Sequence, residues 1–186
     1  MLRKTIKNIA LLDLQNFTAE ALREIKKIES CAMLLIPKNA SDEWKNAYAK
    51  ITIRNVASII EVSYSKYSVL NGMVTLNDKN VSDDCLYIVN GIIILETVEK
   101  IPDLCVNGLL LKRKKSRYEM TRMNGRSVEV EDNVVIKPYP NTIEIDGDTV
   151  RSFDYNTLVA AGNNVDIVDD VTEQMLSDKK ITFAAG

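Results

Sequence analysis

The segment CLYIVNGIIIL, residues 85 to 95, joins two apolar arms at Asn90-Gly91, and this unit recurs along most of the chain. TIKNIALL at 5 to 12 and TIRNVASII at 52 to 60 match each other position by position, with Asn at the equivalent place. VLNGMVTL, CVNGLLL and RMNGRSVEV are further copies. Self-similarity at a period of roughly 20 residues is typical of repeat proteins, in which each coil covers the apolar edge of the next.

The Asn of the unit marks a turn position that can be followed along the chain. Successive turn positions are separated by 22, 25, 16, 19, 17, 17 and 22 residues, and they fall at Asn8, Ser30, Asn55, Asn71, Asn90, Asn107, Asn124 and Asp146. In parallel coils Asn can adopt a left-handed bend, and stacked Asn side chains can hydrogen-bond to one another. We therefore predict a structural turn ladder at these residues, in which the Gly that often follows merely eases the bend.

The intervals also predict the fold class. The first two contain amphipathic helices that begin at Thr18 and Ser41, with Trp44 in a stripe expected to pack in the core. Later intervals are too short for a full helix until residues 171 to 180. We predict a β-rich α/β repeat, a parallel β-solenoid of leucine-rich-repeat-like or β-helix type. It forms a single domain of residues 1–186, with helix-containing coils at about 1–54, strand-and-turn coils at about 55–165, and a C-terminal helix and last strand at about 166–186.

Antiparallel hairpins are the alternative. Asn-Gly or Asp-Gly between apolar arms also favours a two-residue hairpin turn, and TIEIDGDTVR at 142 to 151 has that form. In the early copies, however, Ile9, Cys31 and Val56 follow the turn position, and β-branched residues are strongly disfavoured at positive φ. The sequence therefore favours parallel coils.

The copies VLNGMVTL, IVNGIIIL, CVNGLLL and RMNGRSVEV resemble those of bacterial leucine-rich-repeat-like and β-solenoid repeat proteins, including uncharacterised ones with recurring VNG strands. The resemblance covers roughly residues 5 to 150. It departs from the ordinary leucine-rich-repeat consensus in its irregular spacing and in the Gly after the Asn. It implies the fold class and an interaction-type function, although a fold does not fix a function.

The chain offers few groups for catalysis. It has no His, which excludes imidazole as a general base and the nucleophilic triads that depend on it. Cys31, Cys85 and Cys105 are odd in number, lack metal-type spacing and lie in apolar arms, as expected of buried free thiols. We predict no catalytic residue, no metal site and no cofactor.

Acidic residues are concentrated in the second half, where residues 129 to 178 hold twelve acids and two bases. Acids that alternate with Val128 and Val130 are typical of the solvent-exposed face of a half-buried strand. Paired carboxylates could instead serve a carbohydrate-active or carbohydrate-binding β-solenoid, with Tyr118, Tyr139 or Tyr155 as sugar platforms. That is the alternative function, with candidate acids Glu129, Glu131, Asp132, Glu144, Asp146 and Asp148. A calcium site is a weaker alternative at Asp166, Asp169 and Asp170.

Basic residues are concentrated just before these acids. Residues 111 to 126 hold seven bases and one acid, and the candidate partner-binding residues are Lys112, Arg113, Lys114, Lys115 and Arg117. A solvated connection between coils would have the same composition. The net charge of −2 gives no overall attraction to nucleic acid or to an anionic membrane.

The remaining expectations concern partners and location. The apolar runs are too short to cross a bilayer and the amino terminus is a poor signal peptide, so we expect a cytoplasmic protein without a membrane partner. An uncapped solenoid end exposes a strand edge that recruits other chains. We therefore expect a non-enzymatic protein-interaction or scaffold module whose partner is another protein or a second copy, bound through a solenoid end, and no nucleic acid.

Overall fold

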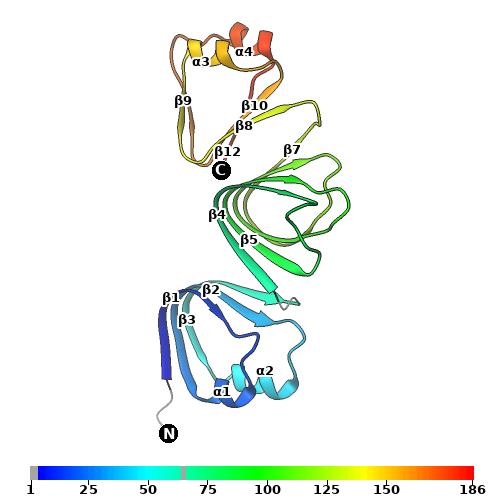
Figure 1. The fold of residues 1–186 in the computed structure, drawn as a ribbon. Helices are drawn as coiled ribbons and strands as arrows, with labels where there is room; N and C mark the ends of the chain where they lie inside the picture. Colours follow the sequence, from blue (N-terminus) through cyan, green and yellow to red (C-terminus); the bar gives the residue numbers. More distant parts are fainter. Residues whose placement is uncertain (1–3, 64–65) are drawn as a thin grey trace. The chain divides into compact units, whose positions relative to one another are not determined.

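The computed structural model describes residues 4–63 and 66–186. The chain forms two compact units, residues 1–65 and 66–186, and each is described by itself (Figure 1). The single repeat domain expected from the sequence stays a prediction, and residues 1–3 of its first coil lie outside the described residues. The elements are β1 (Lys4–Asp13), α1 (Ala19–Arg23), β2 (Ile25–Pro37), α2 (Asp42–Tyr48), β3 (Thr52–Val62), β4 (Lys66–Asn77), β5 (Cys85–Glu96), β6 (Asp103–Arg113), β7 (Glu119–Val130), β8 (Val135–Tyr139), β9 (Ile143–Ile145), α3 (Gly147–Ser152), β10 (Thr157–Ala161), β11 (Val165–Ile167), α4 (Glu173–Lys179) and β12 (Thr182–Ala185).

The first unit is a parallel sheet in the order β1-β2-β3. Its register places the repeat copies side by side, because Ile9 lies opposite Cys31 and Cys31 lies opposite Val56. The similarity between TIKNIALL and TIRNVASII therefore reflects two strands that flank a third and use equivalent residues to do so.

Helices α1 and α2 connect these strands and begin where the sequence predicts. The hydroxyl of Thr18 accepts a hydrogen bond from the backbone N–H of Ala21, and that of Ser41 accepts one from the N–H of Trp44, each at 3.2 Å. Trp44 is 7% exposed, and its Nε1–H donates to the carbonyl of Phe17 at 3.0 Å. The prediction that Trp44 packs in the core is confirmed.

The second unit contains a four-stranded parallel sheet, β4-β5-β6-β7, in which the Asn-Gly dipeptides are in register. Each of these strands continues through its dipeptide; β5, for example, runs from Cys85 to Glu96. The hairpin alternative is therefore wrong for these copies. It is also wrong for residues 142 to 151, because β9 pairs in parallel with β11 and Asp146 caps α3.

The residue that carries the left-handed bend differs between the two units. In the first unit it is the turn residue itself, with φ of 59° at Asn8, 55° at Ser30 and 52° at Asn55. In the four-stranded sheet it is the following glycine, with φ from 82° at Gly72 to 142° at Gly125. The expectation that glycine merely eases an Asn bend is wrong for this sheet, because glycine holds the conformation that other residues avoid.

The C-terminal part repeats the strand–helix alternation of the first unit. Strands β8, β10 and β12 form a parallel sheet, with α3 and α4 in the two connections and β9 paired with β11. Val135 lies opposite Thr157, and Leu158 lies opposite Thr182. The helix expected at residues 171 to 180 is α4. Helix α3 was not predicted from the sequence.

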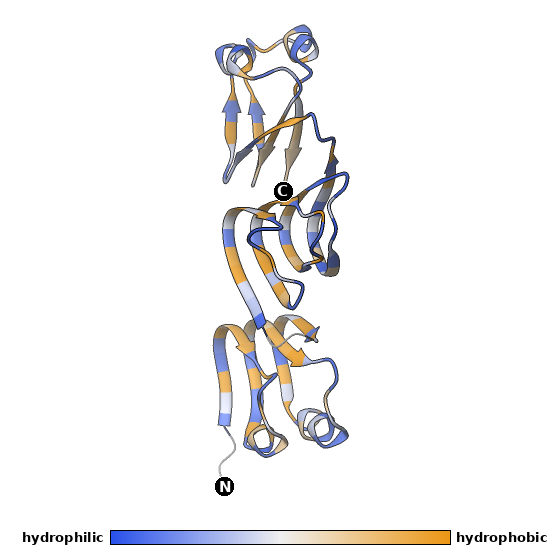
Figure 2. Cartoon of the chain, turned by 45° about the vertical axis from the view of Figure 1, so that its right-hand side comes forward, coloured by the Kyte–Doolittle hydropathy of each residue, from blue (hydrophilic) through white to orange (hydrophobic). Residues whose placement is uncertain are grey.

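The core of the second unit explains why β5 and β6 are apolar along nearly their whole length. Val89 and Ile93 belong to one buried cluster, whereas Ile92 and Ile94 belong to another that includes Leu158 of β10. Both faces of the central strands are thus covered, which removes the alternation of polar and apolar residues. Figure 2 shows hydrophobic residues concentrated in the strands and hydrophilic residues in most of the loops.

Candidate functional site

The amide ladder is formed by Asn71, Asn90 and Asn107, whose side chains are joined across β4, β5 and β6. The Nδ2 of Asn90 donates to the Oδ1 of Asn71 at 2.9 Å, and the Nδ2 of Asn107 donates to the Oδ1 of Asn90 at 2.8 Å. Asn124 stands in register with them, but its side chain makes no hydrogen bond to the residues that the structure describes. A register shift leaves Thr121 of β7 unpaired, and the register is regained from Arg122 onward. The ladder therefore ends at β6.

The other predicted ladder residues lie in different settings. Asn8 and Asn55 occupy left-handed bends on either side of Ser30, so no amide stands between them to continue a ladder. Asp146 is the N-cap of α3, and its Oδ1 accepts a hydrogen bond from the N–H of Thr149 at 2.7 Å. The hydrogen bond with the Thr149 side chain, followed by this backbone bond, lowers the pKa of Asp146.

The basic run, residues 112 to 117, is paired with groups of the same unit. Each of its lysines forms an ion pair with the acid 17 residues later, in the next coil. The pairs are Lys112 with Glu129 at 3.2 Å, Lys114 with Glu131 at 3.0 Å and Lys115 with Asp132 at 3.7 Å. The hydrogen bonds to Glu129 and Glu131 raise the pKa of Lys112 and of Lys114. Three acids of the second half are thus partners of this run, an arrangement that the 17-residue offset of the repeat could have revealed.

The two arginines of the run are engaged as well. The Nε of Arg113 lies 3.5 Å from a carboxylate oxygen of Glu96, and its Nη1 donates to the carbonyls of Glu131 and Val134. Arg117 donates to the carbonyl of Glu99 at 3.3 Å. All five candidate partner-binding residues therefore contact neighbouring coils of their own chain.

Aspartates that bind the backbone of an adjacent coil were not predicted from the sequence. The carboxylate of Asp78 accepts hydrogen bonds from the N–H groups of Val98 and Glu99 at 3.2 Å and of Lys100 at 3.1 Å. These bonds, that of Lys100 foremost, lower the pKa of Asp78. One acid thus fixes the loop between β5 and β6.

Two further aspartates bind the backbone of an adjacent coil. Asp103, which is 6% exposed, accepts hydrogen bonds from the N–H of Thr121 at 3.0 Å and from its hydroxyl at 2.6 Å. Asp170 accepts a bond from the N–H of Gly147 at 3.1 Å. Acid-to-backbone contacts between coils therefore recur in both parts of the second unit.

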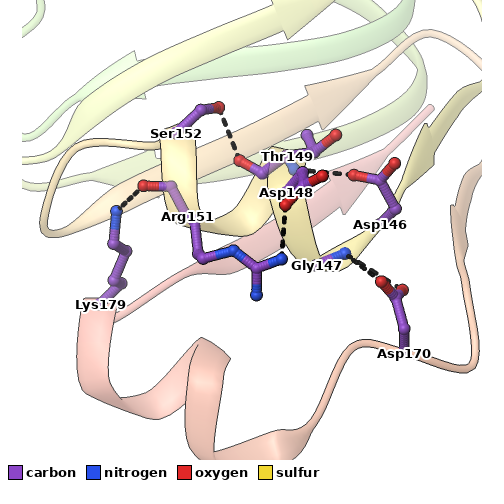
Figure 3. Close-up of polar contacts among 8 residues, drawn as sticks. All are labelled: Asp146, Gly147, Asp148, Thr149, Arg151, Ser152, Asp170 and Lys179. Carbon is purple, nitrogen blue, oxygen red and sulfur yellow. Dashed lines mark hydrogen bonds and ion pairs between the residues drawn. The ribbon is translucent and has the colours of Figure 1, made fainter.

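Polar contacts also join α3 to α4 (Figure 3). Lys179 donates to the carbonyls of Arg151 and Phe153, and Arg151 pairs with Asp148. A small open pocket beside them is lined by Val150, Arg151, Met175, Asp178 and Lys179. Its cationic side chains are already occupied by these intrachain contacts.

The candidate sugar-binding groups are not brought together. Glu129, Glu131 and Asp132 pair with lysines, whereas Asp146 and Asp148 belong to the start of α3. Glu144 is exposed on β9. The tyrosines lie in three settings: Tyr118 beside Lys112, Tyr155 beside Lys180, and Tyr139 against the core around Ile145.

The acids of the calcium alternative do not form a cluster, and the cysteines are buried. Of the acids Asp166, Asp169 and Asp170, the last binds the backbone of Gly147, and the described residues contain no cluster of three metal-ligating side chains. The three cysteines are buried and free, as predicted. Burial raises the pKa of Cys85 and of Cys105, which keeps these thiols protonated.

Comparison of the chain with family models, with curated proteins and with solved structures yields no match. The resemblance to repeat proteins therefore extends to stacked parallel strands and no further. In the part of the chain that the structure describes, no helix has the length and apolar character needed to span a membrane.

Proposed function

We propose that the chain is a parallel β-solenoid that acts as a non-enzymatic interaction or scaffold module in the cytoplasm, and that it binds a second copy of itself through the edge of β1. The open edge of β1 is the observation that carries this proposal. Three buried free thiols suit a reducing compartment. The in-register columns of β4 to β7 support the solenoid, since each coil covers the apolar residues of its neighbour.

A scaffold role is supported by what the charged side chains do. The basic run and the acids Glu129, Glu131 and Asp132 contact one another across coils, and Asp78 and Asp103 bind backbone N–H groups. These contacts hold the coils together. A catalytic acid or base needs a position facing a substrate, and these groups face their own chain.

The edge of β1 is suited to a second strand. Among the described residues β1 pairs with β2 alone, so its other side presents unpaired backbone groups. The N–H of Lys4 donates to the carbonyl of Glu24 at 2.7 Å, on the β2 side. A register shift follows Lys4, but its extra residue lies in β2. Successive residues of β1 therefore keep directing their N–H groups to opposite sides, and we infer that the N–H of Lys7 faces the open edge.

A second β1 is the strand that best matches this edge. When two such strands pair antiparallel over their full length, Lys4 of each lies opposite Asp13 of the other, so the ends of the interface carry opposite charges. The pairing is isologous and closes as a dimer, which is the commonest arrangement of identical subunits.

Light scattering of the full chain and of two variants tests the proposal. The wild type is expected to have the mass of a dimer at about 100 μM, where association is favoured by mass action. Lys7→Pro removes the edge N–H without removing a bond to β2, and is expected to give a monomer with unchanged circular dichroism. Lys7→Ala, which keeps the N–H, should remain dimeric. A monomeric wild type, or a Lys7→Pro variant that remains a dimer, would refute this interface.

A further inference from the structure

Four strands of the second unit carry the same dipeptide at the same position: Asn71-Gly72, Asn90-Gly91, Asn107-Gly108 and Asn124-Gly125. Asn followed by Gly is the dipeptide in which the next backbone nitrogen most readily reaches the side-chain amide carbon, because Gly has no Cβ to obstruct the approach. The four sites are thus chemically alike and differ in their surroundings. The surroundings of each dipeptide therefore determine how readily its Asn side chain reacts with the following backbone nitrogen.

We propose that Asn124-Gly125 is a site of spontaneous deamidation in the folded protein, and that the amide ladder and the central strands protect Asn90 and Asn107. This modification is independent of the β1 dimer. It needs water alone as a co-reactant and no enzyme.

The reaction has two steps. The backbone nitrogen of Gly125 attacks Cγ of Asn124, so that a new C–N bond closes a five-membered succinimide ring. The bond from Cγ to Nδ2 breaks, and Nδ2 leaves as ammonia with the proton from the attacking amide. Water then opens the ring at one of its two carbonyls, which yields aspartate or isoaspartate at position 124.

Asn124 is the least restrained of the four. Its side chain makes no hydrogen bond to the described residues, although it stands in register with Asn107. Asn124 and Gly125 are exposed, and β7 is an edge strand of its sheet. Local opening of an edge strand frees the backbone to reach the ring-closing geometry.

The central sites are restrained in two ways. The Asn90 amide donates to Asn71 and accepts from Asn107, so both its leaving nitrogen and its carbonyl oxygen are held. Asn90 and Asn107 are half-buried, and β5 and β6 pair with a strand on each side. Asn71 is intermediate, since it lies on the edge strand β4 but its Oδ1 accepts the bond from Asn90.

The product has a structural consequence. Isoaspartate adds one carbon to the main chain, which disturbs the alternation of side chains beyond position 124. In the native protein Arg126, two residues further on, donates to the carbonyl of Ala185. Modification at Asn124 is therefore expected to loosen the contact between β7 and the C-terminal strand β12.

Peptide mapping by mass spectrometry tests the proposal, with the four dipeptides serving as matched controls for one another. The folded full chain is incubated in mildly alkaline buffer, and each Asn-containing peptide is followed with time. A parallel sample in concentrated guanidinium chloride gives the rates without structure. Asn124→Gln identifies the modified peptide, because Gln forms the ring far more slowly.

In the folded protein Asn124 is expected to deamidate roughly tenfold or more faster than Asn90 and Asn107, with Asn71 at an intermediate rate. The reason is that ring closure requires local opening of the strand, which is easier at an edge. In denaturant the four rates should converge. Equal rates at Asn90 and Asn124 in the folded protein would overturn the proposal, and so would an Asn124 that converts only in denaturant. Asn71→Ala, which removes the acceptor of the Asn90 amide, should accelerate Asn90; an unchanged rate would remove the protective role of the ladder.

Discussion

A Cβ atom on Gly91 would lie 2.2 Å from the carbonyl oxygen of Gly72 in the preceding strand. The same approach recurs between Gly108 and Gly91 at 2.2 Å and between Gly125 and Gly108 at 1.9 Å. In proteins a Cβ atom essentially never comes within 3.0 Å of a heavy atom outside its own residue and its two chain neighbours. A Cβ on Gly72 would meet open space, because β4 is the edge strand. The glycine column is thus fixed by close contact between backbones as well as by positive φ.

The loss of stability caused by substituting a glycine of this column should depend strongly on its position. Gly91→Ala is expected to lower the free energy of unfolding by more than about 4 kcal/mol, because the clash is with backbone that cannot move without separating the strands. Gly72→Ala has only its positive φ to accommodate and should lose about 1–2 kcal/mol. Urea unfolding of both variants measures the difference. Similar losses would show that the φ angle alone sets the requirement.

Truncation of the amide ladder should have its largest effect at its centre. Asn90→Ala leaves the Oδ1 of Asn71 and the Nδ2 of Asn107 without their partners, and should destabilise the protein by about 1–2 kcal/mol. Asn124→Ala removes no such bond and is expected to change stability by less than about 0.5 kcal/mol. Denaturant midpoints of the two variants give the comparison, and a larger loss at Asn124 would contradict it.

The pKa of Asp78 predicts an acid-sensitive contribution to stability. Its pKa is lowered by the backbone bonds below the ordinary value of 3.8, so the folded state favours the carboxylate. The stabilisation is fully present above the pKa of the unfolded chain, and it is lost as the pH falls through the lower pKa of the folded state. Asp78→Asn should therefore be less stable than the wild type at about pH 7. The difference in stability should narrow as the pH falls below the ordinary value of 3.8.

The matched control for this experiment is Asp169→Asn, which removes one exposed acid on a loop. Its stability should follow that of the wild type across the same range of pH. Urea midpoints measured at each pH provide the readout. A difference in stability between Asp78→Asn and the wild type that widens on acidification would contradict the role of the Asp78 carboxylate as a hydrogen-bond acceptor.

The pairing of the basic run predicts weak binding to polyanions. In the wild type its lysines are matched by Glu129, Glu131 and Asp132, so the protein should elute early from a heparin column. Neutralising these three acids, as Gln, Gln and Asn, should delay elution and change stability by less than about 1 kcal/mol per pair. The control neutralises the exposed Glu144, Asp166 and Asp169, which alters net charge equally. Equal delays would show that net charge alone decides the binding.

The parallel direction of the strands was predictable because two independent features of the sequence indicate it. Apolar arms on both sides of Asn90 indicate a strand, and Ile9 and Val56 disfavour a tight reversal at the equivalent place. The helix starts at Thr18 and Ser41 were predictable for a similar reason, since each cap precedes an apolar stripe.

Other features depend on distances that a sequence does not show. In β4 to β7 the glycine adopts the positive φ because neighbouring backbones approach closely there. The dipeptide Asn-Gly by itself is compatible with a positive φ at either residue. α3 was missed because Asp146-Gly147 has the composition of both a hairpin turn and a capped helix start. Asp78 was not predicted because a single acid in a loop is usually exposed to solvent. Its hydrogen bonds go to the loop of the next coil, and the sequence does not show that this loop lies beside it.

Strand partners in every sheet of the molecule are close in the sequence, with offsets from 16 residues between Asp103 and Glu119 to 25 between Lys27 and Thr52. During synthesis, each strand thus leaves the ribosome shortly after the strand it will pair with. Pairing within a sheet need not wait for a distant segment, so the chain can assemble in the order in which it is translated, and an early stall would leave pairs that are already formed.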